Sequence, residues 1–169
     1  LALVEETAGT GAWTEVSPAL YETLSLAQEM ARQSDGAFDV TSGTLTELWD
    51  AARAAQHPPT AEEIAAAQSR VDWHALELRE RAADDGEHPE VRLLRAGMKI
   101  DRGALIKGLA LDGIARSWAA GGAVNALADL GSSSILACGV NAEGEPWRIG
   151  IRNPRGESRS DLAATVQLS

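Results

Sequence analysis

The stretch Ile100-Asp101-Arg102-Gly103-Ala104-Leu105-Ile106-Lys107-Gly108 decides the fold, because a strand-like run ends here and a long helix begins. The apolar periodicity predicts that this helix runs from about Ala104 to Ala120. Asp101 stands where an N-cap residue would stand, and the alternative is a carboxylate held beside a ligand at the strand end. The backbone N–H groups around Gly103 and Ala104 are suited to binding phosphate, since glycine allows close approach of the chain.

Lys107 begins an apolar row on this helix that continues through Leu111, Ile114 and Trp118 at the spacing of one helical face. That position predicts a partly buried ammonium group, which needs an anionic partner. The first turn of a helix also disfavours a cation, because the helix dipole is positive there. An anion bound at the helix start would remove both penalties. The alternatives are that Lys107 extends to solvent or pairs with Asp101.

The residues before this junction alternate between helical and strand-like patterns. Ser17-Pro18 predicts the start of a helix, and Ser34-Asp35-Gly36 predicts its end. Thr44 with Glu47 and Thr60 with Glu63 have capping-box spacing and predict two further helices, the last reaching about Ser69. From Trp73 to Ile100 the pattern predicts strands, joined by a solvated loop over Asp84–Pro89.

After the long helix, Ala126 to Ser169 has the pattern of short strands separated by turns. No internal repeat or low-complexity linker interrupts the chain, and its length suits one domain with a sizeable core. We therefore expect an α+β fold, with residues 1–169 forming a single mixed α/β domain.

A second informative stretch is Gly36-Ala37-Phe38-Asp39-Val40-Thr41, which links two predicted helices. Its alternation predicts a short extended segment with Phe38 and Val40 on one side and Asp39 and Thr41 on the other. Core packing is one interpretation for Phe38, the only phenylalanine of the chain. Turn formation or helix capping is one interpretation for Asp39 and Thr41.

Composition excludes some functions. The net charge of −10 and the lack of a basic run argue against nucleic-acid binding. No apolar run is long enough to span a bilayer, and no stretch has the pattern of a signal peptide. His57, His74 and His88 lack metal-ligand spacing, and the serines that follow Gly131 (Ser132-Ser133-Ser134) suggest a polar turn.

Gly36–Thr41 and, later in the chain, Ile100–Asp112 resemble in order and spacing the two signature segments of the ApbE family, the FAD:protein FMN transferases. The context resembles that family too: the Ser-Pro helix start, the later Trp147-Arg148-Ile149-Gly150-Ile151 and the turn at Asn153-Pro154. The resemblance runs from about Ser17 to Pro154.

The resemblance implies a role for each matching residue. Ala37, Phe38, Asp39, Asp101 and Lys107 would bind FAD, and the backbone carbonyl of Ala104 would bind Mg²⁺. The implied reaction is attack by the threonine hydroxyl of an acceptor protein on the FMN phosphorus of FAD, with AMP as the leaving group. No residue is assigned a catalytic role.

The resemblance also carries expectations about the whole protein. Family members continue for roughly as long again after the point that matches Ser169, and that part carries further magnesium ligands, so we expect a truncated flavin transferase domain. A flavin-binding remnant without catalysis and an FAD pyrophosphatase are the alternatives. Family members are commonly exported and often lipid-anchored. This implies an extracytoplasmic bacterial protein, anchored to the membrane through a segment ahead of Leu1.

Overall fold

The computed structural model describes residues 1–83, 86–101, 103–158 and 160–169. Its contacts divide the chain into two compact units, Leu1–Leu105 and Ile106–Ser169. Asp84 and Asp85 of the predicted loop lie outside the described residues, as does Arg102 of the first quoted stretch. The mixture of helices and strands confirms the predicted fold class. That residues 1–169 form a single domain stays a prediction.

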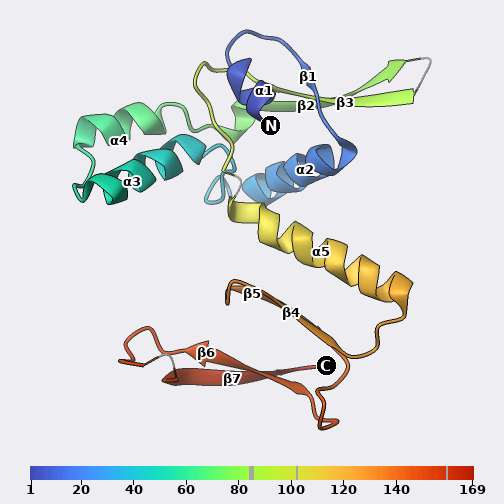
Figure 1. Cartoon of the computed structure of the whole chain (residues 1–169). Helices are drawn as coiled ribbons and strands as arrows, with labels where there is room; N and C mark the ends of the chain where they lie inside the picture. The colour runs from blue at the N-terminus through green and yellow to red at the C-terminus, as the bar shows by residue number, and fades with distance from the viewer. Residues whose placement is uncertain (84–85, 102, 159) are drawn as a thin grey trace. The chain divides into compact units, whose positions relative to one another are not determined.

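The first unit combines a small sheet with helices (Figure 1). Its helices are α1 (Ala2–Glu6), α2 (Pro18–Gln33), α3 (Gly43–Ala55), α4 (Ala61–Gln68) and the short 3₁₀ helix η1 (Trp73–Ala75). Its strands are β1 (Thr14–Glu15), β2 (Leu76–Ala83) and β3 (Gly86–Leu93), which pair antiparallel in the order β1-β3-β2. Helices α3 and α4 lie side by side (Figure 1).

The core of this unit forms where α2 meets β2 and β3. Leu24, Ala27 and Ala31 of α2 are buried at the spacing of one helical face. The buried cluster comprises Val4, Ala8, Leu24, Ala27, Val40, Ala75, Leu76, Val91, Leu93, Met98 and Ile100. Val40 and Ile100 come from the two stretches that the sequence singled out, so both stretches are anchored in one core.

Of the three helix caps predicted ahead of the long helix, two are confirmed. Ser17 caps α2 by accepting a hydrogen bond from Leu20 N, and Thr60 with Glu63 forms a complete capping box at α4. The cap predicted at Thr44 is wrong, since α3 already begins at Gly43. The buried Thr44 hydroxyl instead donates to the carbonyl oxygen of Ala67 across 3.1 Å, because a partner on α4 competes with the local cap.

The extended segment predicted for Phe38–Thr41 is also wrong, because this segment forms turns. Asp39 Oδ1 accepts a hydrogen bond from the backbone N–H of Thr41, and this local bond folds the chain back. Thr41 is fully buried with Val40, whereas strand alternation would put them on opposite sides.

The second unit contains most of α5 (Gly103–Gly121) and two antiparallel strand pairs. One pair is β4 (Ala126–Leu130) with β5 (Ser134–Cys138), and the other is β6 (Trp147–Arg152) with β7 (Leu162–Leu168). The long helix and the short strands were predicted from the sequence. None of the described α5 side chains is buried.

Candidate functional site

The Ala37–Asp39 segment lies directly after the end of α2. Gly36 has a left-handed φ of 77°, which turns the chain out of the helix. The backbone N–H of Phe38 then donates to Ser34 Oγ across 3.0 Å. Ala37 is exposed, whereas Phe38 is half-buried and packs against the core. The segment therefore presents one exposed residue and anchors the next.

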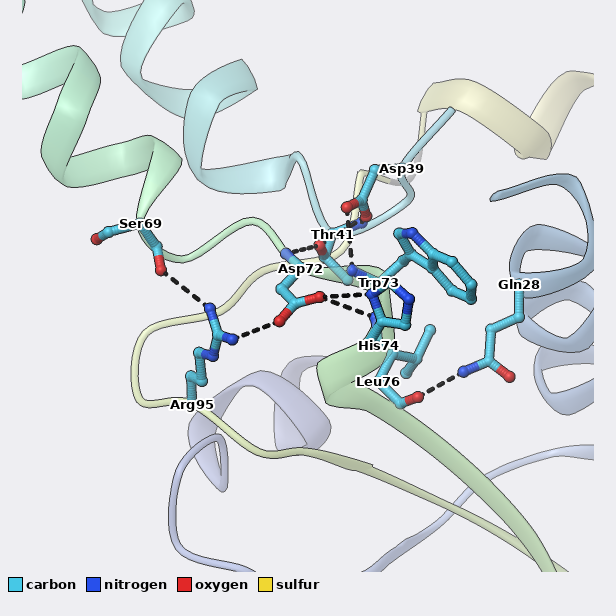
Figure 2. Close-up of polar contacts among 9 residues, drawn as sticks. All are labelled: Gln28, Asp39, Thr41, Ser69, Asp72, Trp73, His74, Leu76 and Arg95. Atoms are coloured by element: carbon cyan, nitrogen blue, oxygen red, sulfur yellow. Dashed lines mark hydrogen bonds and ion pairs between the residues drawn. The ribbon is translucent and has the colours of Figure 1, made fainter. Parts of the chain in front are cut away.

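The Asp39 carboxylate accepts hydrogen bonds from two parts of the chain (Figure 2). Oδ1 accepts from both the backbone N–H and the hydroxyl of Thr41, each at 2.7 Å. Oδ2 accepts from the backbone N–H of Trp73 at 3.0 Å. Asp39 thus joins its own turn to the start of η1. No sequence pattern indicated the Trp73 contact, because Asp39 and Trp73 are distant along the chain.

Asp101 lies next to this segment. Its backbone N–H donates to the carbonyl oxygen of Val40 across 2.7 Å, so the two sequence stretches meet in the first unit. Its Oδ1 accepts from the N–H of Gly103, the first residue of α5, at 2.8 Å. Its Oδ2 accepts from the hydroxyl of Thr46 at 3.0 Å. The carboxylate therefore caps the start of α5 and also connects it to α3 through Thr46.

Lys107 belongs to the second unit, and its environment fits the alternative that the side chain extends to solvent. The side chain is exposed rather than partly buried, because the apolar row on α5 is itself only half-buried at Leu111, Ile114 and Trp118. Its Nζ donates to Ser133 Oγ across 2.7 Å. An exposed ammonium group pays little desolvation cost, so burial gives it no need for an anion.

The Ser133 turn borders a groove within the second unit. Gly131 and Ser132 both have left-handed φ values, 70° and 56°. The groove has a volume of about 770 Å³. It is lined by Gly131, Ser132, Ser133, Ile135, Ile149, Gly150, Ile151, Arg152, Pro154 and Leu162. The sequence predicted the turn but gave no sign of the groove, which needs β6 and β7 beside β5.

The described residues do not by themselves fit a magnesium site. Within residues 1–83, 86–101, 103–158 and 160–169, no three side chains of His, Cys, Asp or Glu come together as metal ligands. Ala104 is the second residue of α5, and only its backbone carbonyl oxygen could be a ligand. Magnesium requires about six oxygen ligands, so one carbonyl is not enough.

With the fold and the site in view, comparison with known families matches residues 1–169 to the ApbE family. This chain belongs to the ApbE family. A curated relative from Treponema pallidum, an FAD:protein FMN transferase, is 32% identical over an alignment of 149 residues that covers 83% of this chain and 41% of the relative. Another, from Salmonella typhimurium, is 30% identical and matches 82% of this chain and 39% of its own length.

A solved ApbE protein from Thermotoga maritima shares the fold, with a TM-score of 0.73 and 29% identity. The match covers 99% of this chain and 51% of that structure. The chain therefore spans about half of a solved ApbE structure and about two fifths of the curated relatives. Among the described residues, no helix is both long and apolar enough to cross a membrane.

Proposed function

We propose that this ApbE-family chain takes part in transferring FMN from FAD to a protein threonine hydroxyl, with release of AMP. The phosphoanhydride bond of FAD breaks, and a phosphoester bond forms between the FMN phosphorus and the threonine oxygen. The hydroxyl proton leaves, and AMP carries the oxygen that bridged the two phosphorus atoms. Two relatives named FAD:protein FMN transferases support this proposal.

The observation that carries the proposal is the bond between Asp101 N and Val40 O. It brings Asp101 beside the segment Ala37, Phe38 and Asp39, and all four residues are proposed to bind FAD. Lys107 supplies an exposed ammonium group. Such a group suits the diphosphate of FAD, since charge stabilisation is the main need of phosphoryl transfer.

We further propose that transfer requires Mg²⁺, with the Ala104 carbonyl as one of its ligands. Further ligands are needed, because the described residues hold no group of three or more His, Cys, Asp or Glu side chains that could bind the ion. The location proposed is extracytoplasmic in a bacterium, with membrane anchoring. Fractionation of cells that carry the natural gene tests the location.

The first test is a titration with FAD, followed by flavin fluorescence with and without MgCl₂. We expect saturable binding that Lys107→Ala and Asp39→Ala both weaken. Lys99→Ala is the matched control for charge, because Lys99 pairs with Glu47 instead. Unchanged affinity in both site variants would overturn the site assignment.

The second test measures AMP and free FMN after incubation with FAD, Mg²⁺ and a candidate acceptor protein. AMP release with FMN bound to the acceptor indicates transfer. AMP with an equal amount of free FMN indicates the FAD pyrophosphatase. FAD binding without AMP release indicates a flavin-binding remnant.

A further inference from the structure

We infer that Thr41 is a positioning residue for the proposed flavin site, which it serves by fixing the Ala37–Asp39 segment against the turn at Asp72–Trp73. This inference rests on the proposed function. It concerns residues that the sequence and the family resemblance leave without a role in binding: Thr41 itself, Asp72 and Trp73.

The first support is the burial of the Thr41 hydroxyl. The residue has 0% exposure, and its Oγ1 both donates and accepts. It donates to Asp39 Oδ1 at 2.7 Å and accepts from the backbone N–H of Asp72 at 2.9 Å. A buried hydroxyl with both partners satisfied has one orientation only, because any other orientation would leave a buried polar group unpaired.

The second support is that the contacts close a ring (Figure 2). Thr41 connects Asp39 to Asp72 through its hydroxyl. Asp39 Oδ2 then accepts a hydrogen bond from the N–H of Trp73, the residue after Asp72, at 3.0 Å. Neither turn can shift alone without breaking hydrogen bonds at two points. The Thr41 hydroxyl contacts both turns through the same atom, Oγ1.

The third support is the packing of Trp73 beside the segment. A Cβ added at Gly36 would lie 3.3 Å from the indole Nε1 and 3.7 Å from Cδ1. Trp73 thus lies against the glycine that precedes Ala37, and its backbone N–H is a member of the Thr41 ring. A displaced Asp72–Trp73 turn would therefore move the indole that lies against Gly36 and the N–H that Asp39 Oδ2 accepts from.

Outer contacts hold the ring in place (Figure 2). Asp72 Oδ1 accepts from His74 N at 3.0 Å, and Asp72 Oδ2 pairs with Arg95. These contacts hold the Asp72 carboxylate in place, while the Thr41 hydroxyl binds the backbone N–H of the same residue. Thr41 is therefore the inner member of a network that reaches from the segment to Arg95.

The test compares Thr41→Val, which keeps the shape but loses the hydroxyl, with Thr41→Ser, which keeps the hydroxyl. We expect Thr41→Val to weaken FAD binding about tenfold, and Thr41→Ser to stay within about twofold of the wild type. Thr44→Val is the matched control, because Thr44 is also buried but bonds to Ala67. It removes a buried hydroxyl elsewhere and should leave FAD affinity unchanged.

Amide hydrogen exchange without flavin provides the second measurement. In the wild type, the N–H groups of Thr41, Asp72 and Trp73 should be protected. In Thr41→Val, the N–H of Asp72 should exchange at least about tenfold faster, with protection restored in Thr41→Ser. Rapid exchange of all three amides in the wild type would overturn the inference even if the valine variant failed to fold.

The outcomes separate the two proposals. A wild-type chain that binds no FAD would contradict the proposed function. FAD binding that Thr41→Val leaves unchanged, in a folded variant, would contradict the positioning role alone. Equal weakening by Thr44→Val would also contradict it, because the effect would then reflect general destabilisation.

Discussion

The backbone N–H of Asp101 donates to the carbonyl oxygen of Val40 across 2.7 Å. This bond lies beside a parallel bridge between Ser42 and Lys99, so a short pairing joins the two signature stretches. Both flanking side chains, Val40 and Ile100, are buried in the same core. The proposed binding residues of the first unit are therefore held by the packing of the fold itself.

The Asp101 carboxylate should contribute to stability without any ligand. Asp101→Ala removes the acceptor for Gly103 N and for the Thr46 hydroxyl, so we expect the free energy of unfolding to fall by about 1–2 kcal/mol. Urea unfolding, monitored by circular dichroism, measures this loss of free energy. Asp50→Ala is the control, since Asp50 makes an exposed pair with Arg53. An equal effect of both substitutions would contradict the capping role.

Local signals predicted the parts of this fold that local bonds create. Ser17 and Thr60 cap helices because their hydroxyls bond to N–H groups three residues later. Thr44 with Glu47 has the same capping-box spacing as Thr60 with Glu63, yet the Thr44 hydroxyl donates to the carbonyl oxygen of Ala67. That partner comes near only when α3 and α4 pack, and single-sequence patterns do not contain this information.

The candidate site shows the same division. The two stretches were found from their motifs, and a cap at Asp101 was one of the roles considered for it. The bonds that Asp39 and Thr41 make to Trp73 and Asp72 were not predicted, because they depend on tertiary packing. The exposure of Lys107 matches one alternative considered for it, whereas the partial burial predicted from the apolar row is wrong. Helical periodicity identifies the face that carries it, but not how deeply that face is covered.

The capping box of α4 gives a second prediction. Thr60→Ala removes the acceptor for Glu63 N, so we expect a loss of about 1 kcal/mol in the free energy of unfolding. Thr60→Ser keeps the acceptor and should retain most of the stability. Thermal or urea unfolding of the three proteins checks this. A serine variant as unstable as the alanine variant would indicate that the methyl group, rather than the hydroxyl, matters.

Glu90 gives a pH dependence. Hydrogen bonds from Arg79 first, and also from Arg81, hold the pKa of this carboxyl below its ordinary value of 4.5, against the effect of burial. Because the folded state has the lower pKa, the stabilisation is fully present above pH 4.5. It is lost as the pH falls through the lower folded value.

Glu90→Gln and Arg79→Gln should therefore both flatten the decline of stability in acid. Arg79 and Glu90 are directly opposed on β2 and β3, so either substitution removes the same cross-strand pair. The measurement is the free energy of unfolding from neutral pH down to pH values below the ordinary carboxyl pKa. An acid slope unchanged in both variants would contradict a lowered pKa for Glu90.

Gly43 should be intolerant of any side chain. A Cβ there would lie 2.8 Å from the backbone carbon and oxygen of Lys99 and 2.9 Å from the backbone carbon of Ile100. Gly43→Ala must therefore push apart the pairing that brings Asp101 to Val40. We expect a loss of about 1–3 kcal/mol in the free energy of unfolding, and weaker FAD binding if the proposed site is correct.

The matched control is Gly108→Ala, because the same substitution in α5 meets no atom within 4 Å apart from its chain neighbours and the adjacent backbone of its own helix. Alanine is the better helix former, so this variant should gain about 0.5–1 kcal/mol. Urea unfolding should therefore show a lower free energy of unfolding for Gly43→Ala and a higher one for Gly108→Ala. The difference is expected because the backbone approaches closely at Gly43 but not at Gly108. A Gly43→Ala variant as stable as the wild type would mean that the backbone at Lys99 and Ile100 can move aside at little cost in free energy. The junction would then be too loose to hold Asp101 against the Ala37–Asp39 segment.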